Sequence, residues 1–161
     1  EAARAEGLEV DSRLLRTGVD WWRDRVDVLL VEGVGGLLCP LTDSETVADL
    51  VSDLDWPLLI VARTGLGTIN HTLLTIEVAR RRDLKIAGLV LNEPEPPALD
   101  DESCLTNADG IFRHGKIPIL AHVNHGHSGR LRPIAGSSTI DWLSLIGRPA
   151  NTVPLTDDTS R

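Results

Sequence analysis

The chain has no methionine, no tyrosine and only two cysteines among its 161 residues. Cys39 and Cys104 form no spaced pair, which argues against a disulfide framework or a cysteine metal site and favours a reducing compartment. A net charge of −8 argues against a general binder of nucleic acid or of anionic membranes. The chain has no apolar run of membrane-spanning length and no hydrophobic signal region at its start. We therefore expect a cytoplasmic protein with no nucleic-acid partner and no membrane partner.

Two further absences bear on the chemistry. The chain begins at Glu1 rather than at a methionine, so we expect the N-terminal part of a longer protein to be missing from this sequence. The pattern G-x-x-x-x-G-K-[ST], whose backbone N–H groups and lysine cradle nucleotide phosphates, occurs nowhere in it. With 161 residues and 42% hydrophobic content, the chain is still large enough for one domain with a core.

Strand-length apolar runs alternate with stretches of helical periodicity along most of the chain. Strands are predicted at 26–31, 58–62, 85–91 and 117–123, and helices at 11–25, 44–54, 68–82, 103–113 and 140–146. Such alternation predicts parallel strands joined by right-handed helical crossovers. We expect one α/β domain over residues 1–147 and a flexible tail over residues 148–161. In sheets of this kind, ligands bind beyond the carboxyl ends of the strands.

The most informative motif is the run V-E-G-V-G-G at residues 31–36, at the end of the first predicted strand. The carboxylate of Glu32 can bind a hard cation such as Mg²⁺, which takes one or two protein carboxylates. The glycines allow the backbone to approach a phosphate or a substrate closely. The alternative is a strand-ending turn with an exposed acid, because glycine-rich turns after strands are common.

Gly67 and Thr68 lie at the start of the helix predicted at 68–82. The free backbone N–H groups at a helix start bind anions, aided by the helix dipole. The Thr68 hydroxyl and the Asn70 amide can add hydrogen bonds to a carboxylate. The alternative is an ordinary N-cap, a role that threonine fills well.

Polar residues also follow the next two strands. Asn92 follows the strand at 85–91, and its amide has donors and an acceptor that suit a purine edge. A turn-forming asparagine is the alternative. His122, His125 and His127 lie close together at the end of the last strand. Histidine clusters can bind zinc, but this spacing matches no defensible ligand pattern, and a solvated loop is the alternative.

Two segments, in this order, resemble the ATP-dependent dethiobiotin synthetase family. The stretch VEGVGGLLCPLTD at residues 31–43 is similar to the family's V-E-G-[AG]-G-G-x-x-x-P-L pattern. The stretch LGTINHTLLT at residues 66–75 is similar to its L-G-x-I-N-H-x-x-L-T pattern. Further matches lie at the strand before Asn92 and at KIPILAHV, residues 116–123, so the resemblance covers residues 1 to about 126.

The resemblance implies a P-loop NTPase-like three-layer α/β fold with a mostly parallel sheet, here without its N-terminal strand and phosphate loop. It also implies a homodimer and a ligase of biotin biosynthesis that uses ATP and Mg²⁺. The implied reaction joins carbon dioxide to 7,8-diaminononanoate and closes a ring to give dethiobiotin. The alternatives are a related cobyrinate diamide synthase-type ligase and a non-catalytic dimerising domain derived from the same fold.

The resemblance also implies roles for individual residues. Glu32 matches a magnesium ligand, and Asn92 with Glu93 matches the adenine-reading position. The substrate carboxylate is expected at the helix start across the dimer interface, at Gly67, Thr68 and Asn70. The implied nucleotide-binding residues are Glu32, Gly33, Val34, Gly35, Asn92, Glu93, Asn124, His125 and Gly126.

The chain departs from the family pattern in ways that bear on activity. Asn124 stands where the family usually has proline and Ala121 where it usually has glycine, so the base-binding loop is expected to differ. The phosphate loop with its lysine, the second catalytic lysine and the remaining metal-binding aspartate have no counterpart here. We therefore assign no catalytic residue and expect the chain alone to have little or no synthetase activity. Loss of the first strand is also expected to leave an exposed sheet edge.

Overall fold

The computed structural model describes residues 2–96, 103–126, 132–133 and 140–146. The elements in chain order are α1 (Ala2–Ala5), α2 (Ser12–Arg23), α3 (Val47–Leu54), β1 (Leu58–Arg63), α4 (Thr68–Arg81), β2 (Ile86–Asn92), α5 (Ser103–Gly115), β3 (Ile119–Val123), β4 (Arg132–Pro133) and α6 (Trp142–Leu145). The predicted tail at 148–161 lies outside the described residues, as does His127. None of the described helices has the length and apolar character needed to cross a bilayer.

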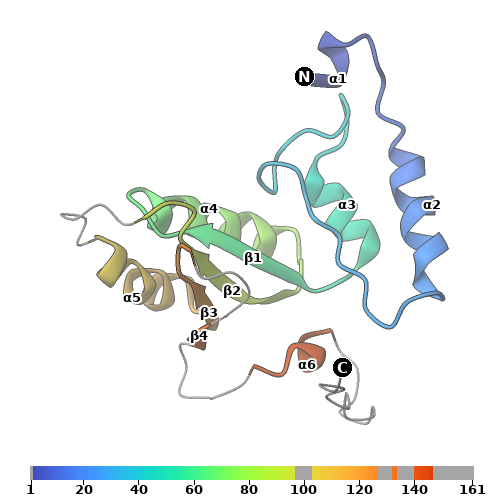
Figure 1. The fold of residues 1–161 in the computed structure, drawn as a ribbon. Coiled ribbons are helices and arrows are strands. Elements are labelled where there is room, and N and C mark those ends of the chain that lie inside the picture. The colour runs from blue at the N-terminus through green and yellow to red at the C-terminus, as the bar shows by residue number, and fades with distance from the viewer. Residues whose placement is uncertain (1, 97–102, 127–131, 134–139, 147–161) are drawn as a thin grey trace.

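A four-stranded sheet in the order β1-β2-β3-β4 forms the centre of the fold (Figure 1). Strands β1, β2 and β3 are parallel, and β4 pairs antiparallel with β3. Arg63, Asn92 and Val123 lie side by side in register, so the three carboxyl ends meet at one edge. The predicted α/β fold with a mostly parallel sheet is confirmed, and three predicted strands agree with the structure to within two residues.

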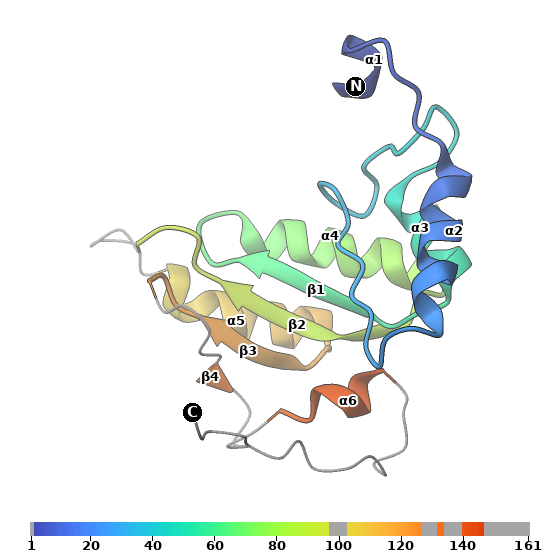
Figure 2. The same ribbon diagram turned by 45° about the vertical axis from the view of Figure 1, so that its right-hand side comes forward.

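Helices α4 and α5 cover the same face of the parallel strands (Figure 2). Consecutive strands are neighbours in this sheet, and right-handed crossovers then put both helices on one side. Two glycines of α5 allow the helices to pack closely, because a Cβ on Gly110 would lie 2.7 Å from Ile69 Cδ1 and one on Gly115 would lie 2.8 Å from Ile76 Cδ1. The largest core side chains that are at most 2% exposed are those of Ile76, Leu89, Leu91 and Ile111.

A second, smaller core joins α3 to the back of α4 and centres on Leu37, Val47, Ala48 and Ala79. The segment before α3 also satisfies the free N–H groups of its first turn, since Val47 N donates to Cys39 O at 3.0 Å and Ala48 N to Leu37 O at 2.8 Å. The helix predicted at 44–54 begins later, at Val47. Asp49 accepts from both the N–H and the hydroxyl of Thr46 at 2.6 Å, which makes Thr46 the N-cap.

The strand predicted at residues 26–31 is wrong. The segment is irregular, and Val28, Leu30 and Val31 are 44%, 84% and 44% exposed. A strand needs neighbours for its backbone N–H and C=O groups, and no described strand pairs with this segment. The apolar character of the run was therefore not enough to make it part of the sheet.

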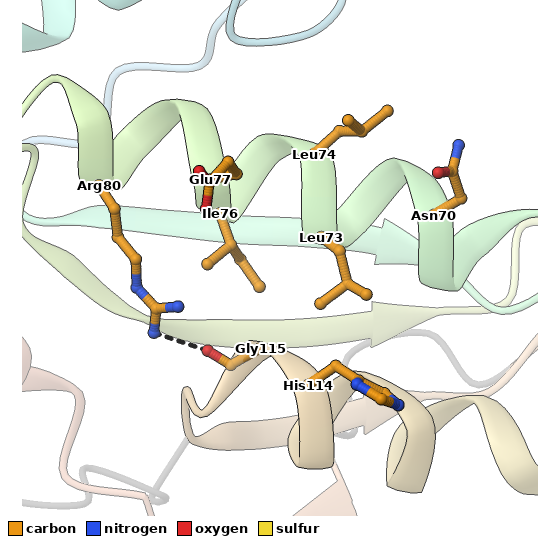
Figure 3. Close-up of a pocket in the computed structure, with 8 residues that line it drawn as sticks. All are labelled: Asn70, Leu73, Leu74, Ile76, Glu77, Arg80, His114 and Gly115. Atoms are coloured by element: carbon orange, nitrogen blue, oxygen red, sulfur yellow. Dashed lines mark hydrogen bonds between the residues drawn. The ribbon is translucent and has the colours of Figure 1, made fainter.

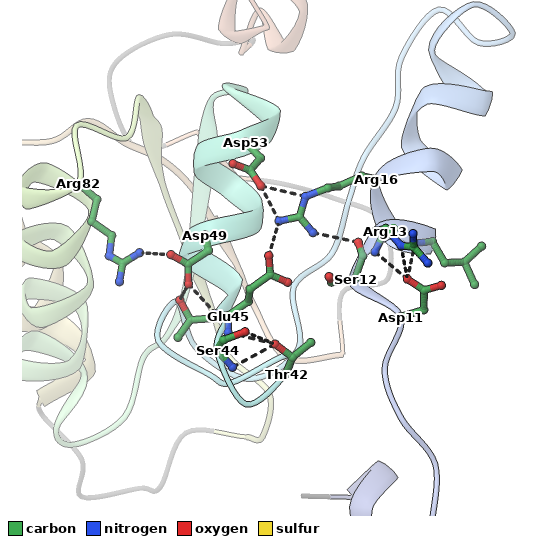
Figure 4. Close-up of polar contacts among 12 residues, drawn as sticks. Asp11, Ser12, Arg13, Arg16, Thr42, Ser44, Glu45, Asp49, Asp53 and Arg82 are labelled. Carbon is green, nitrogen blue, oxygen red and sulfur yellow. Dashed lines mark hydrogen bonds and ion pairs between the residues drawn. The ribbon is translucent and has the colours of Figure 1, made fainter.

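A polar cluster holds α2 against α3 (Figure 4). Arg16 donates to Asp53 Oδ2 at 2.5 Å and to Glu45 Oε1 at 3.0 Å. The hydrogen bond to Asp53 is the main reason that the pKa of Arg16 is raised above its usual value. On the other side of α3, Arg82 donates to Asp49 Oδ1 at 2.7 Å and links the helix to the end of α4. Charged contacts thus supplement the small apolar core of this region.

Candidate functional site

The carboxyl ends of β1, β2 and β3 are joined by backbone hydrogen bonds just beyond the strands. Thr64 N donates to Asn92 O at 3.1 Å, and Glu93 N donates to Val123 O at 2.9 Å. On α5, Asn107 donates its amide to Thr64 O, and both residues are 5% exposed. The three loops that follow the strands are therefore fixed relative to one another.

Glu93 connects the end of β2 to the end of β3. Its Oε1 lies 3.0 Å from His122 Nε2, and its Oε2 accepts from His125 N at 3.2 Å. His125 Nδ1 also lies 3.2 Å from Pro94 O. Two of the three clustered histidines are thus in contact with the loop after β2, a contact that neither the zinc nor the solvated-loop interpretation anticipated. Across the described part of the chain, no three histidine, cysteine or acidic residues are grouped as metal ligands.

Two asparagines at these strand ends have side-chain amide atoms without a partner among the described residues. The side-chain oxygen of Asn124 is buried and has no hydrogen-bond partner. The Asn92 amide has no partner among the described residues, and both residues are partly exposed. Buried polar atoms of folded proteins are nearly always paired, so an unpaired one indicates a missing donor. An amide pair of this kind suits the polar edge of a planar base.

The glycine-rich loop at residues 31–36 lies beside α3 (Figure 1). A Cβ on Gly33 would lie 3.1 Å from Val47 Cγ1, so Gly33 allows close packing on the helix. Gly35 has φ +71°, a backbone conformation in which a side chain would be strained. A Cβ on Gly35 would also lie 3.0 Å from Cys39 Sγ. Glu32 is exposed, so its carboxylate is accessible to a cation, but the described residues place no group of further ligands around it. Glu32 can thus provide one oxygen for Mg²⁺ but not a complete site.

The start of α4 differs in part from its prediction. Gly67 has φ +87°, a left-handed conformation that favours glycine, and no atom lies within 4 Å of the place where a Cβ would be. Thr68 is 1% exposed, and its hydroxyl lies 3.5 Å from that of Thr72, so it faces the interior rather than a ligand. Asn70 is exposed, and among the described residues no acceptor pairs with the backbone N–H of Ile69 or Asn70. The free N–H groups of this helix start remain suited to an anion.

A shallow pocket of about 300 Å³ runs between α4 and α5, with Asn70 at one end (Figure 3). Leu73 and Ile76 point into it from α4, and His114 lies on its α5 side. Arg80 closes the other end by donating to Gly115 O at 2.6 Å. The pocket contains none of the strand-end residues, so it is separate from the group formed by Asn92, Glu93 and Asn124.

Sequence reasoning missed Asn107 as a contributor to this edge of the sheet and gave Arg63, at the end of a predicted strand, no role. Asn107 interrupts the apolar side of α5, and its burial beside Thr64 was not expected from a predicted helix. Arg63 ends β1 next to Asn92, is exposed, and forms no ion pair with any described residue. Its position at a strand end was the available signal, since it brings a cation to the edge where ligands bind in such sheets.

Comparison with known proteins agrees with this arrangement. A family model described as an AAA domain matches residues 1–128. Proteins named ATP-dependent dethiobiotin synthetase BioD match from Anaeromyxobacter dehalogenans, 51% identical over 70% of this chain and 49% of the relative, and from Bacillus licheniformis, 41% identical over 74% and 50%. A protein of the same name from Haloferax mediterranei is 54% identical over 45% of this chain and 31% of its own length.

This chain belongs to the ATP-dependent dethiobiotin synthetase family. Its fold is accordingly of the P-loop NTPase type, as the resemblance implied. The chain spans about half the length of the curated relatives it matches. The matched residues 1–128 include the glycine-rich loop, the start of α4 and the ends of β1, β2 and β3.

Proposed function

We propose that this chain forms the base-binding and carboxylate-binding part of a cytoplasmic dethiobiotin synthetase. The observation that carries the proposal is that the Asn92 amide and the Asn124 side-chain oxygen have no partner among the described residues and lie at the edge of the sheet where such folds bind ligands. An adenine base has an exocyclic amine and ring nitrogens on its edge, and these complement an amide oxygen and an amide N–H.

The proposed reaction uses ATP to form a cyclic urea. One amine of 7,8-diaminononanoate adds to carbon dioxide and loses a proton to become a carbamate. A carbamate oxygen then attacks the γ-phosphorus of ATP, and ADP leaves. The second amine attacks the carbonyl carbon of the mixed anhydride, and phosphate leaves as the ring closes. The work of the protein in such a sequence is to position the reactants and to stabilise charge.

Residues of the strand ends and the glycine-rich loop are proposed to hold the nucleotide. Asn92 and Asn124 would bind the base, and the loop of His125 and Gly126 would cover it. Glu32 would supply one carboxylate oxygen to Mg²⁺, which when bound neutralises charge on the phosphates. Gly33, Val34 and Gly35 would follow the nucleotide with their backbone. Arg63 is a further cation at the same edge and is proposed to attract the phosphates.

The substrate carboxylate is proposed to bind at the start of α4. The free N–H groups of Ile69 and Asn70 and the exposed Asn70 amide would hold it, with Gly67 giving the turn its shape. Thr68 would not touch the carboxylate directly, because its side chain is buried and its backbone N–H donates to Gly65 O at 3.2 Å. A second copy of the chain is proposed to cover this region, where Leu66 and Leu74 are 84% and 56% exposed.

Heat denaturation with and without ligands tests this proposal. We expect 7,8-diaminononanoate to raise the Tm of the chain, and its carboxamide analogue, which lacks the anionic group, to have little effect. Asn70→Leu should abolish this rise in Tm. The buried Asn107 is not substituted in the experiment. Equal shifts from acid and carboxamide would refute the carboxylate site. Dethiobiotin formation by the 161-residue chain alone would contradict the expectation of little or no activity.

A further inference from the structure

The carboxylate of Glu93 is the most enclosed acid at the proposed nucleotide site. Its side chain is 12% exposed and that of His122 is 24% exposed, so both side chains are largely removed from solvent. His122 Nε2 lies within ion-pair distance of Oε1, although the ring is not aligned for a linear hydrogen bond. The other oxygen of Glu93 accepts the backbone N–H of His125. Both oxygens of Glu93 are therefore already in use.

These contacts connect two loops that are far apart in sequence. His122 lies in β3, Glu93 follows β2, and His125 begins the loop after β3. The same two loops are joined by Glu93 N to Val123 O and by His125 Nδ1 near Pro94 O. Asn124 lies between His122 and His125 in the sequence. The residues on both sides of it contact Glu93 or Pro94, and these contacts restrict the position of its backbone.

We propose that His122 is a positioning residue for the base site: it fixes Glu93, Glu93 fixes the backbone of His125, and Asn124 is thereby held facing the same edge as Asn92. This inference rests on the proposed nucleotide site. It assigns Glu93 a supporting role rather than a contact with the base, because its oxygens are occupied. It also gives the histidine cluster a function that requires no metal.

The test compares three substitutions in the full 161-residue chain. His122→Leu removes the ring nitrogen, and His122→Gln restores an N–H donor near the position of Nε2. His114→Leu, at the exposed far end of α5, is the matched histidine control. Two quantities are measured for each variant: hydrogen exchange of the His125 backbone amide by NMR, and the Kd for ATP by calorimetry. Tm is recorded alongside.

We expect His122→Leu to speed exchange at His125 and to weaken ATP binding about tenfold, the effect of one charge-assisted contact. His122→Gln should restore most of both, and His114→Leu should change neither. If His122→Leu does not fold, Glu93→Gln, which removes the charge and one acceptor, is expected to give the same two changes.

Unchanged exchange at His125 in His122→Leu and Glu93→Gln would overturn the proposal. Faster exchange with an unchanged Kd would also overturn it, because the contact would then have no bearing on the base. A parent chain that binds no ATP refutes the proposed nucleotide site instead. In that case the exchange data still report whether His122 fixes the loop, so the two failures are distinguishable.

Discussion

Residues 26–31 and strand β2 are both apolar runs, yet only β2 is a buried strand of the sheet. In β2, Leu89 and Leu91 are 0% and 2% exposed, and the strand pairs with β1 on one side and β3 on the other. In the N-terminal run, Leu30 is 84% exposed and no described strand pairs with it. An apolar sequence thus makes a buried strand only where neighbours satisfy its backbone and helices cover its side chains.

The largest expected effect comes from the same substitution made in the two runs. Leu91→Ala should lower the free energy of unfolding by about 2–5 kcal/mol, since it leaves a cavity among Ile76 and Ile111. Leu30→Ala should change it by less than about 0.5 kcal/mol, because the side chain is already in solvent. Urea denaturation followed by circular dichroism measures both. Equal losses would mean that residues 26–31 are buried in solution.

The polar cluster of the N-terminal region gives the next prediction. Arg16→Ala should cost about 1–1.5 kcal/mol, because it removes partly exposed charged hydrogen bonds to Asp53 and Glu45. Arg13→Ala, whose side chain is 90% exposed and 3.7 Å from Asp11, is the matched control and should be nearly neutral. Denaturation curves monitored by tryptophan fluorescence suit this test. A loss in both variants would show that the cluster has no special part in holding α2.

Alanine substitutions at Gly67, before α4, and at Gly36, in the glycine-rich loop, test whether each backbone position requires glycine. Gly67→Ala should cost about 1 kcal/mol, because φ is +87° at the start of α4. Gly36→Ala should be neutral or slightly stabilising, since its φ is not positive and a Cβ there would meet nothing within 4 Å. Thermal unfolding of the two variants provides the comparison. Gly67→Ala with parental stability would argue that the turn before α4 adapts freely.

The smallest effect concerns pH and Asp49. Hydrogen bonds from the Thr46 hydroxyl and N–H, and then from Arg82, hold the pKa of Asp49 well below its usual range. The stability due to this carboxylate is therefore fully present above its unfolded pKa of about 3.9 and is lost as the pH falls below that value. Asp49→Asn should be less stable than the parent at pH 6, with the difference shrinking by pH 3. A difference that does not depend on pH would contradict the assigned cause.

Much of the sheet was predictable because local patterns and geometry agree there. Runs such as 85–91 are bounded by turns, and the ends of parallel strands meet at one edge, so the pattern alone predicts the place of Asn92, whereas Asn124 is implied only by the family resemblance. The contact of His122 with Glu93 was not predictable, because it depends on the register of β2 and β3 rather than on any spacing within the sequence.

Other errors also come from tertiary context. The helix after the glycine-rich loop begins at Val47 rather than at residue 44, because Thr46 and Asp49 form a capping box there. Thr68 was expected to face a ligand, but the packing of α4 turns its hydroxyl toward Thr72. Sequence patterns identify the residue types available at a helix start without fixing which side chains face outward.

The central claim is that a purine base binds at the ends of β2 and β3. The most direct measurement is the NMR spectrum of the ¹⁵N-labelled chain during titration with ATP, with UTP as the control nucleotide. The account predicts that ATP shifts the amide signals of Asn92, Glu93 and residues 123–126 and that UTP leaves them nearly unchanged. Shifts confined to the pocket between α4 and α5, or the same shifts with UTP, would contradict it.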